Sequence, residues 1–159
     1  MNDLFNEYAR DILEHELFLL GKRTISHGAV SIYAHSVNVA KTAFSFCKKC
    51  EEREKNRKGP GIDARCVVRA GLLHDFFLYE WHTPGIRYLL HGWAHPKAAA
   101  ENARAVFNLS DKECSCIRTH MWPWTLFHPP RCREGWIISL ADKLVAGKET
   151  FLHRPLRGF

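Results

Sequence analysis

Hydrophobic positions recur along most of the chain at the 3.6-residue spacing of helices that face a core, and no segment alternates with the period of two typical of strands. The spacing predicts helices over residues 3–20 and 29–54, each with one apolar face. The GPG segment at 59–61 breaks this pattern, and Asp63 is a suitable N-cap for a third helix over 63–80. Because the apolar positions of the third helix are nearly continuous, we expect it to be buried on most sides.

The pattern is interrupted again in the middle of the chain. Residues 81–95 contain glycine and proline and are expected to form a loop with about one helical turn. Pro96 favours the first position of a helix, which makes His95 the N-cap of an alanine-rich helix over 96–107.

The last part of the chain carries clear helix start and stop signals. Ser110-x-x-Glu113 is a capping box that opens a further helix, and Pro123 ends that helix just after His120. A final helix is expected over 133–152. Together these elements predict an all-α protein of six or seven helices.

The length of 159 residues suits one domain. We expect this domain to occupy residues 1–159, with its core over about 28–150 and a loose tail at 153–159. The hydrophobic content of 46% and the charged content of 25% are typical of globular proteins.

The formal net charge of +6 does not predict a nucleic-acid-binding protein, because basic residues alternate with acidic ones, as in KKCEEREKNRK at 48–58. A moderate positive field suits a small anionic substrate such as a phosphate ester. No apolar run approaches the roughly 20 residues that a membrane span needs, and the N-terminal segment is charged. We therefore expect a cytoplasmic protein without membrane contact.

Six cysteines leave two readings open. Cys47-x-x-Cys50 and Cys114-x-Cys116 are the two halves of a conceivable structural zinc site, although the second spacing suits zinc poorly. The alternative, which we favour, is that the cysteines are free thiols, as expected in a reducing compartment.

The stretch LLHDFFLYEWH at 72–82 is apolar enough for the interior of a protein, yet it contains His74 and Asp75. Burying a carboxylate is costly unless it is paired or binds a metal ion. Adjacent residues on a helix point about 100° apart, so the two side chains meet one ion only if both lean into a shared cleft.

Further histidine and aspartate residues lie in similar settings. Taken singly, a histidine on a helix is more often a hydrogen-bonded structural residue than a metal ligand. Taken together, imidazole and carboxylate groups are the ligand set for zinc, iron and manganese. The candidate metal ligands are His35, His74, Asp75, His95, His120 and Asp142.

In order and approximate spacing, His35, His74-Asp75 and Asp142 resemble the H…HD…D signature of the HD superfamily of metal-dependent phosphohydrolases. The resemblance covers about residues 28–150 and implies a single HD-like helical bundle. Segments similar to those of one bacterial branch are HDFFLY at 74–79, HGWAHPKAAAEN at 91–102 and HMWP at 120–123.

The resemblance also implies a binuclear metal site. The first ion would be held by His35, His74, Asp75 and Asp142, and the second by His95 and His120, with Asp75 bridging the two. A hydroxide bridging the ions would attack the phosphorus of a phosphomonoester or phosphodiester, which we expect to be a nucleotide. Iron is our first choice of metal, with manganese, zinc, nickel or magnesium as the other options.

The residues around this signature say less about the substrate. A lysine a few residues after the HD pair, found in some branches of the superfamily, is missing here near Leu78 and Tyr79. Besides His74 and Asp75, we expect Lys97 and Lys143 to serve catalysis by binding phosphate, Lys97 from a helix N-terminus that favours anions. Helix geometry points Lys143 away from Asp142, which makes it the weaker candidate.

Several other residues near the signature are possible site residues. Aromatic side chains there either stack on a nucleobase or, as we favour, belong to the core and its rim: Tyr79, Trp81, Trp93, Trp122 and Trp124. Further candidate cations and reserve histidines are Arg87, Arg118, His82, His91 and His128.

The alternative to a hydrolase is a non-catalytic HD-like domain that senses or binds a nucleotide. A complete set of candidate ligands favours the enzyme.

Overall fold

The computed structural model describes residues 2–24, 30–54, 60–77 and 86–152, and for residues 2, 86–93 and 152 it describes only the backbone. Within these ranges the chain forms helices and no β-strand, which confirms the predicted all-α class. The helices are α1 (Asn2–Leu13), α2 (Glu16–Leu19), the 3₁₀ helix η1 (Leu20–Lys22), α3 (Ile32–Arg53), α4 (Ala64–Leu73), α5 (Ile86–Phe107), α6 (Asp111–Thr119) and α7 (Arg133–Leu152).

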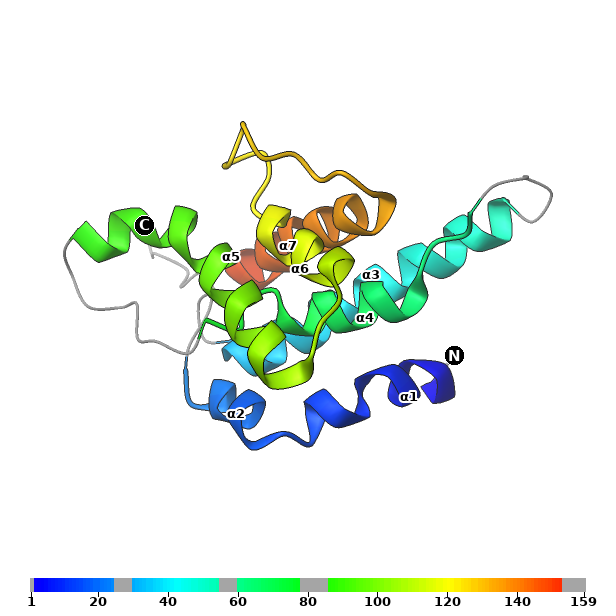
Figure 1. The fold of residues 1–159 in the computed structure, drawn as a ribbon, viewed down its shortest axis with the longest axis horizontal. Coiled ribbons are helices and arrows are strands. Elements are labelled where there is room, and N and C mark those ends of the chain that lie inside the picture. The colour runs from blue at the N-terminus through cyan, green and yellow to red at the C-terminus, as the bar shows by residue number, and fades with distance from the viewer. Residues whose placement is uncertain (1, 25–29, 55–59, 78–85, 153–159) are drawn as a thin grey trace, which may run out of the picture.

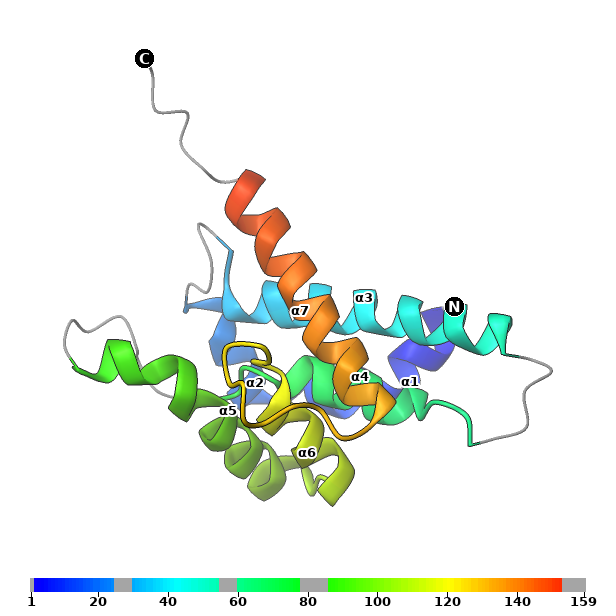
Figure 2. The ribbon, with the colours of Figure 1, turned by 90° about the horizontal axis from the view of Figure 1, so that it is seen from above.

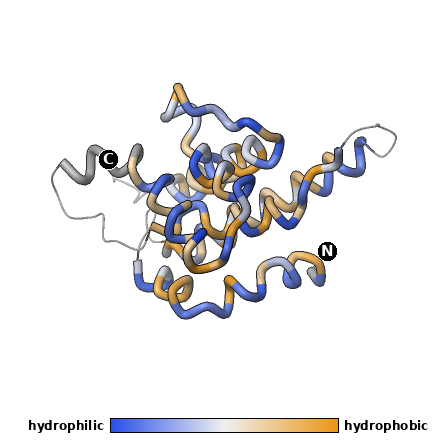
Figure 3. The backbone as a smooth tube through the Cα atoms, in the orientation of Figure 1, coloured by the Kyte–Doolittle hydropathy of each residue, from blue (hydrophilic) through white to orange (hydrophobic). Residues whose placement is uncertain are grey.

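Helices α3, α4 and α7 form the centre of the molecule. The long helix α3 packs along α4, and α7 lies against α3, α4 and α6, as the two ribbon views show (Figures 1 and 2). Helix α1 covers α4 from one side, and α5 pairs with α6. Hydrophobic and hydrophilic positions follow each other along most helices (Figure 3), so each helix presents an apolar face to a shared core.

The contact between α3 and α4 is close enough to require a glycine. A Cβ atom at Gly71 would lie 3.0 Å from the Cα atom of Ala40, which is tighter than most Cβ contacts in proteins. The missing side chain therefore lets the two backbones touch one turn before His74. This approach brings the end of α4 next to the first turns of α3.

The prediction of one helix over 3–20 is wrong, because α1 ends at Leu13 and a second helix, α2, begins at Glu16. His15 adopts an extended backbone conformation and acts as the N-cap of α2, and its Nδ1 accepts a hydrogen bond from the Leu17 amide at 3.2 Å. A residue with extended dihedral angles cannot continue a helix, so α2 and η1 leave α1 in a new direction.

The predicted helix over 63–80 begins as expected but is shorter. Asp63 caps α4 by accepting a hydrogen bond from the Cys66 amide at 2.9 Å. The helix then ends at Leu73, with His74 as its C-cap, and the Phe76 amide closes a tight turn on the Leu73 carbonyl. His74 and Asp75 thus lie at a helix end rather than within a helix; positions 78–80 fall outside the described residues.

The predictions for residues 81–96 are wrong where the structure describes them. Pro96 lies inside α5, which begins at Ile86, and His95 is therefore an interior helical residue and not an N-cap. Proline inside a helix removes one hydrogen bond and bends the axis, and α5 changes direction along its length (Figure 1). Burial of His95, Ala99 and Ala103 against the core offsets this cost.

The late elements agree with the prediction. The capping box is present, since Ser110 Oγ accepts from the Glu113 amide while the Glu113 carboxylate accepts from the Ser110 amide. His120 is the C-cap of α6, and α7 spans Arg133–Leu152. The tail at 153–159 lies outside the described residues. None of the described helices is both long and apolar enough to cross a membrane.

The cysteines are free, as favoured. The Cys47 thiol donates to Glu51, whereas Cys116 lies near Cys66 and Cys132, with sulfur–sulfur distances of 3.9 and 3.5 Å. The two halves of the alternative zinc site therefore have different neighbours.

Candidate metal centre

Five helices deliver the six predicted metal ligands to one place. His35 comes from the first turns of α3, His74 and Asp75 from the end of α4, and His95 from the middle of α5. His120 ends α6, and Asp142 lies in the middle of α7. The four histidines are at most 4% exposed, so these groups meet inside the protein.

Asp75 lies at the centre of this cluster, with one oxygen towards each half. Its Oδ2 is 3.5 Å from His74 Nε2 and 3.9 Å from His35 Nε2. Its Oδ1 is 3.4 Å from His95 Nε2 and 3.8 Å from His120 Nε2. One carboxylate thus faces two different pairs of imidazole nitrogens.

Asp142 completes the half that contains His35 and His74. Its Oδ1 lies 3.2 Å from His35 Nε2 and 3.7 Å from His74 Nε2. Ligands about 2.1 Å from a metal ion and separated by 90–109° lie roughly 3.0–3.4 Å apart. The observed separations are close to that range.

Hydrogen bonds made by the far sides of the rings fix the tautomers of His74 and His120. The Nδ1 of His74 lies 2.8 Å from the Gly71 carbonyl oxygen, and the Nδ1 of His120 lies 2.7 Å from the Ile117 carbonyl oxygen. A carbonyl oxygen only accepts, so each Nδ1 carries the proton and donates. The Nε2 atoms that face the cluster are therefore free to act as metal ligands.

His35 is held in the same way by a carboxylate. Its Nδ1 donates to Glu149 Oε2 at 2.7 Å, and Asn38 donates to the other oxygen of Glu149 at 3.2 Å. A carboxylate on the far nitrogen of a histidine ligand raises the basicity of the ring and fixes its orientation. Sequence reasoning missed Glu149, although it lies seven residues after Asp142, two turns along the same face of α7.

The environment of His74 Nε2 suits a metal ion. His74 Nε2 is fully buried and has no hydrogen-bond partner among the residues that the structure describes, although it points among the carboxylates of Asp75 and Asp142. A buried polar atom without a partner is unfavourable, and coordination of a cation removes that cost. Two groups of ligand atoms close enough for one ion are His35, His74 and Asp142, and His74, Asp75 and His120.

Helix ends add to the preference for a cation. Both α4 and α6 end in the cluster, at His74 and His120. The C-terminal end of a helix carries a partial negative charge, which favours positive charge nearby. The two helix ends therefore act in the same direction as the two carboxylates.

The pKa values of the cluster reflect strong mutual interactions. Burial lowers the pKa of His35, but its hydrogen bonds to Asp142 and Glu149 outweigh this effect and raise it to about 10. Burial, together with charge on His74 and His95, holds the pKa of His120 well below its usual value. Burial raises the pKa of Asp75, but the charge of His74 and the hydrogen bond of His95 lower it well below the usual value, so its carboxylate stays ionised.

Lys143 lies differently from the prediction. Its Nζ contacts Asp142 Oδ2 at 2.9 Å and donates to the His120 carbonyl at 2.6 Å. The expectation that it points away from its neighbour is wrong, because the flexible lysine side chain folds back over the end of α6. Lys143 thus reaches the edge of the cluster.

Lys97 is not brought to the cluster. Its side chain is 75% exposed, with Nζ 3.9 Å from Glu101, and it lines a different pocket together with Arg118 and His128. Pro96 precedes it inside α5, so no helix N-terminus lies there.

The predicted aromatic residues divide into two sets. Trp122 is half-buried and packs edge-on against Trp136, whereas Trp124 is 73% exposed. The other positions considered earlier lie outside the described side chains: Tyr79, Trp81, His82, Arg87, His91 and Trp93.

Comparison with known proteins agrees with this geometry. A family model described as "HD domain" matches residues 32–147, which span most of the chain and all six candidate ligands. No curated protein and no solved structure matches the chain. Because the family match covers well over half of the sequence, the chain belongs to the HD domain family.

Proposed function

We propose that this protein is a metal-dependent phosphohydrolase that transfers the phosphoryl group of a small phosphate ester, a nucleotide being the first choice, to water. The family generally consists of phosphohydrolases, and the chain retains the buried histidine and aspartate cluster. The observation that carries the proposal is the position of Asp75, whose two oxygens face different pairs of histidines.

We further propose that the cluster holds two divalent transition metal ions. One ion would be held by Asp75 Oδ2 together with His35, His74 and Asp142. The other would be held by Asp75 Oδ1 together with His95 and His120. Imidazole nitrogens favour transition metals such as iron, manganese or zinc over magnesium, which prefers oxygen ligands. Such ions supply Lewis acidity towards the phosphoryl oxygens and activate a water molecule at neutral pH.

The chain's own residues have definite tasks in this reaction. Glu149 holds His35 in one orientation, and the carbonyl groups of Gly71 and Ile117 do the same for His74 and His120. Lys143, which contacts the outer oxygen of Asp142, would neutralise phosphate charge at the edge of the cluster. Lys97 remains a candidate only for binding parts of the substrate that extend far from the cluster.

The test compares Asp75→Ala with His128→Ala. Asp75 connects both halves of the cluster, so its loss should reduce the metal content from about two ions per chain to less than one. Hydrolysis should fall roughly 1,000-fold or more, as expected from losing several kcal/mol of transition-state stabilisation. Metal content is measured by elemental analysis, and activity on a panel of phosphate esters with added Fe²⁺ or Mn²⁺.

His128 is an exposed histidine outside the cluster, and its replacement by alanine should leave metal content and activity unchanged. A wild-type protein that binds no metal and hydrolyses no ester would contradict the proposal. A nucleotide that raises the melting temperature but is never hydrolysed would instead support a non-catalytic binding domain.

A further inference from the structure

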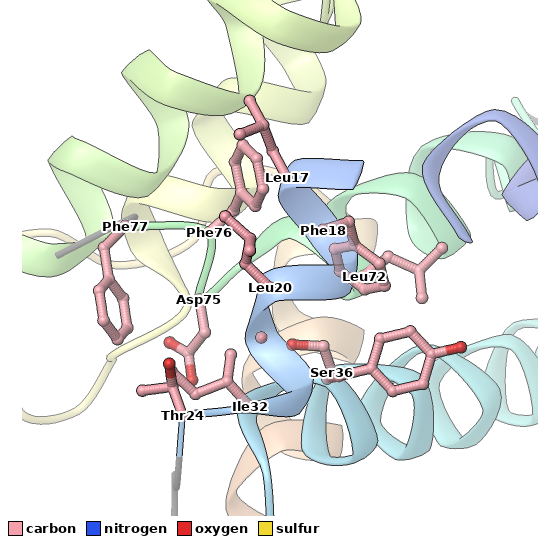
Figure 4. Close-up of a pocket in the computed structure, with 12 residues that line it drawn as sticks. Leu17, Phe18, Leu20, Thr24, Ile32, Ser36, Leu72, Asp75, Phe76 and Phe77 are labelled. Atoms are coloured by element: carbon pink, nitrogen blue, oxygen red, sulfur yellow. The ribbon is translucent and has the colours of Figure 1, made fainter. Parts of the chain in front are cut away.

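A cavity of about 320 Å³ opens beside the metal cluster, on the side of η1 (Figure 4). Its wall comes from α2, η1, the first turns of α3 and the end of α4, and Asp75 is part of that wall. Asp75 therefore faces the histidines and also borders the cavity. A molecule bound there would lie directly next to the candidate metal centre.

The lining of this cavity is almost entirely uncharged. Aliphatic and aromatic side chains dominate it, among them Leu20, Ile32 and Phe76. No lysine, arginine or histidine occurs among the described residues that line it, and Asp75 is its one charged residue. Such a surface favours an apolar group, and its described residues offer no cation to pair with additional phosphates.

One polar group in the wall lacks a partner. Ser36 is 1% exposed, and its hydroxyl oxygen is buried without a hydrogen bond among the described residues. In Figure 4 the Ser36 hydroxyl points towards the side of the cavity on which Ile32 and Asp75 lie. A buried hydroxyl without a partner is unfavourable, so a ligand that supplies a donor or acceptor there gains affinity.

The size of the cavity limits what it can hold. Ligand pockets in proteins usually measure about 300–1,000 Å³, so this cavity is at the small end of that range. It suits one compact group, comparable to a single ring system with a short chain. A dinucleotide or a polyphosphate chain is too large or too charged for it.

We propose that the cavity binds the alcohol portion of the substrate, and that the substrate is a phosphate monoester of a compact, uncharged and mainly apolar alcohol. The phosphate would lie at the metal cluster, and the alcohol would extend past Asp75 towards Ser36 and Leu20. Hydrolysis breaks the bond between phosphorus and the ester oxygen and releases the alcohol and inorganic phosphate. A simple aromatic or aliphatic alcohol fits this description best, whereas a nucleoside is uncharged but carries more polar groups. The inference rests on the proposed function, which it makes more specific.

The first experiment uses the metal-loaded wild-type protein and three monoesters, 2-phenylethyl phosphate, adenosine 5′-monophosphate and glycerol 1-phosphate. All three release alkyl alcohols, so differences in kcat/KM report how the alcohol is bound. We expect kcat/KM for at least one of the first two esters to exceed that for glycerol 1-phosphate about tenfold or more. The better of the two identifies which kind of alcohol the cavity prefers. Equal values for all three would overturn the inference.

The second experiment fills the cavity. Leu20 is 49% exposed and borders it, so Leu20→Trp should lower kcat/KM for the preferred ester about tenfold and change that for glycerol 1-phosphate less than twofold. Leu144→Trp, at a leucine on α7 with 43% exposure, is the matched control and should change neither. An equal loss for both esters, or no loss, would count against a role of the cavity.

A binding measurement separates this inference from the proposed function. Each ester should raise the melting temperature by binding, and this rise needs no turnover. The rise should be larger for the preferred ester than for glycerol 1-phosphate, and it should be lost in Leu20→Trp. If no ester is hydrolysed but this pattern is observed, the cavity is confirmed as a binding site while the proposed enzyme activity fails. If the esters are hydrolysed but the melting temperatures do not follow this pattern, the proposed enzyme activity is supported and the cavity is rejected as the binding site for the alcohol.

Discussion

Arg69 and the histidines around Asp75 both bring ionisable groups into the interior, but they find very different partners there. Arg69 is 3% exposed, and its Nη1 donates to both carboxylate oxygens of Asp11 at 2.8 and 2.6 Å. Its Nη2 donates to the Phe107 carbonyl at 3.1 Å, and its Nε lies 3.2 Å from Glu113 Oε1. A permanent cation thus meets two carboxylates and a carbonyl within the chain itself.

The cluster at the other end of α4 is built from acceptors. The Nε2 atoms of His74 and His120, whose Nδ1 atoms donate to carbonyl oxygens, lie near the carboxylates of Asp75 and Asp142. At Arg69 the opposite charges come from the chain itself, although Arg69 Nε and Glu113 Oε1 meet without the geometry of a hydrogen bond, and removing one partner of such a buried pair is costly. Acceptors that converge on one point without a matching donor, as at His74 Nε2, indicate a site for an external cation.

The largest expected effect comes from removing Arg69 from its buried ion pairs. Arg69→Met should lower the free energy of unfolding by about 3–5 kcal/mol, because it removes the buried guanidinium that faces both Asp11 and the buried Glu113 carboxylate. Denaturant unfolding of the metal-free protein measures this loss. Arg104→Met removes an arginine from an exposed pair with Asp111, and we expect its stability to stay close to that of the wild type. A stable Arg69→Met protein would show that the pair is not required for folding.

A somewhat smaller effect should come from adding a metal ion to the cluster of histidines around Asp75. At a free metal concentration 100 times the dissociation constant, the free energy of unfolding should rise by about 2.7 kcal/mol. The rise should persist in Arg104→Met and disappear in Asp142→Asn, since Asp142 contributes a proposed ligand oxygen between His35 and His74. Thermal unfolding with Mn²⁺ and after chelation measures it. An undiminished rise in Asp142→Asn would place the ion elsewhere.

The smallest effect concerns the carboxylate behind His35. Glu149→Gln keeps the size of the side chain but removes the charge next to His35 Nδ1, so metal affinity should fall about 10- to 100-fold with little change in folding. Competition with a chelator measures the affinity. Glu101→Gln, at an exposed carboxylate far from the cluster, provides the control. Equal affinities for the two variants would mean that Glu149 does not act through His35.

Local signals in the sequence were reliable where a few neighbouring residues decide the outcome. The capping box at Ser110, the N-cap at Asp63 and the end of α6 at His120 all depend on hydrogen bonds within one turn, and each was predicted. The family signature likewise pointed to His35, His74, Asp75 and Asp142, and the resemblance to branches with two metal ions added His95 and His120. Lys143 and Glu149 were misjudged or missed because their roles depend on residues more than 20 and 100 positions away.

The sequence by itself determined the helical class, most helix ends and the set of candidate ligand residues, because periodicity, capping and motif order are properties of the chain. Only the tertiary structure decided how Asp75 divides its two oxygens between pairs of histidines, and which apolar residues border it. It also decided that α5 continues through Pro96, since burial against the core outweighs the local preference of proline. Packing of distant helices sets these features, and no short stretch of sequence encodes that packing.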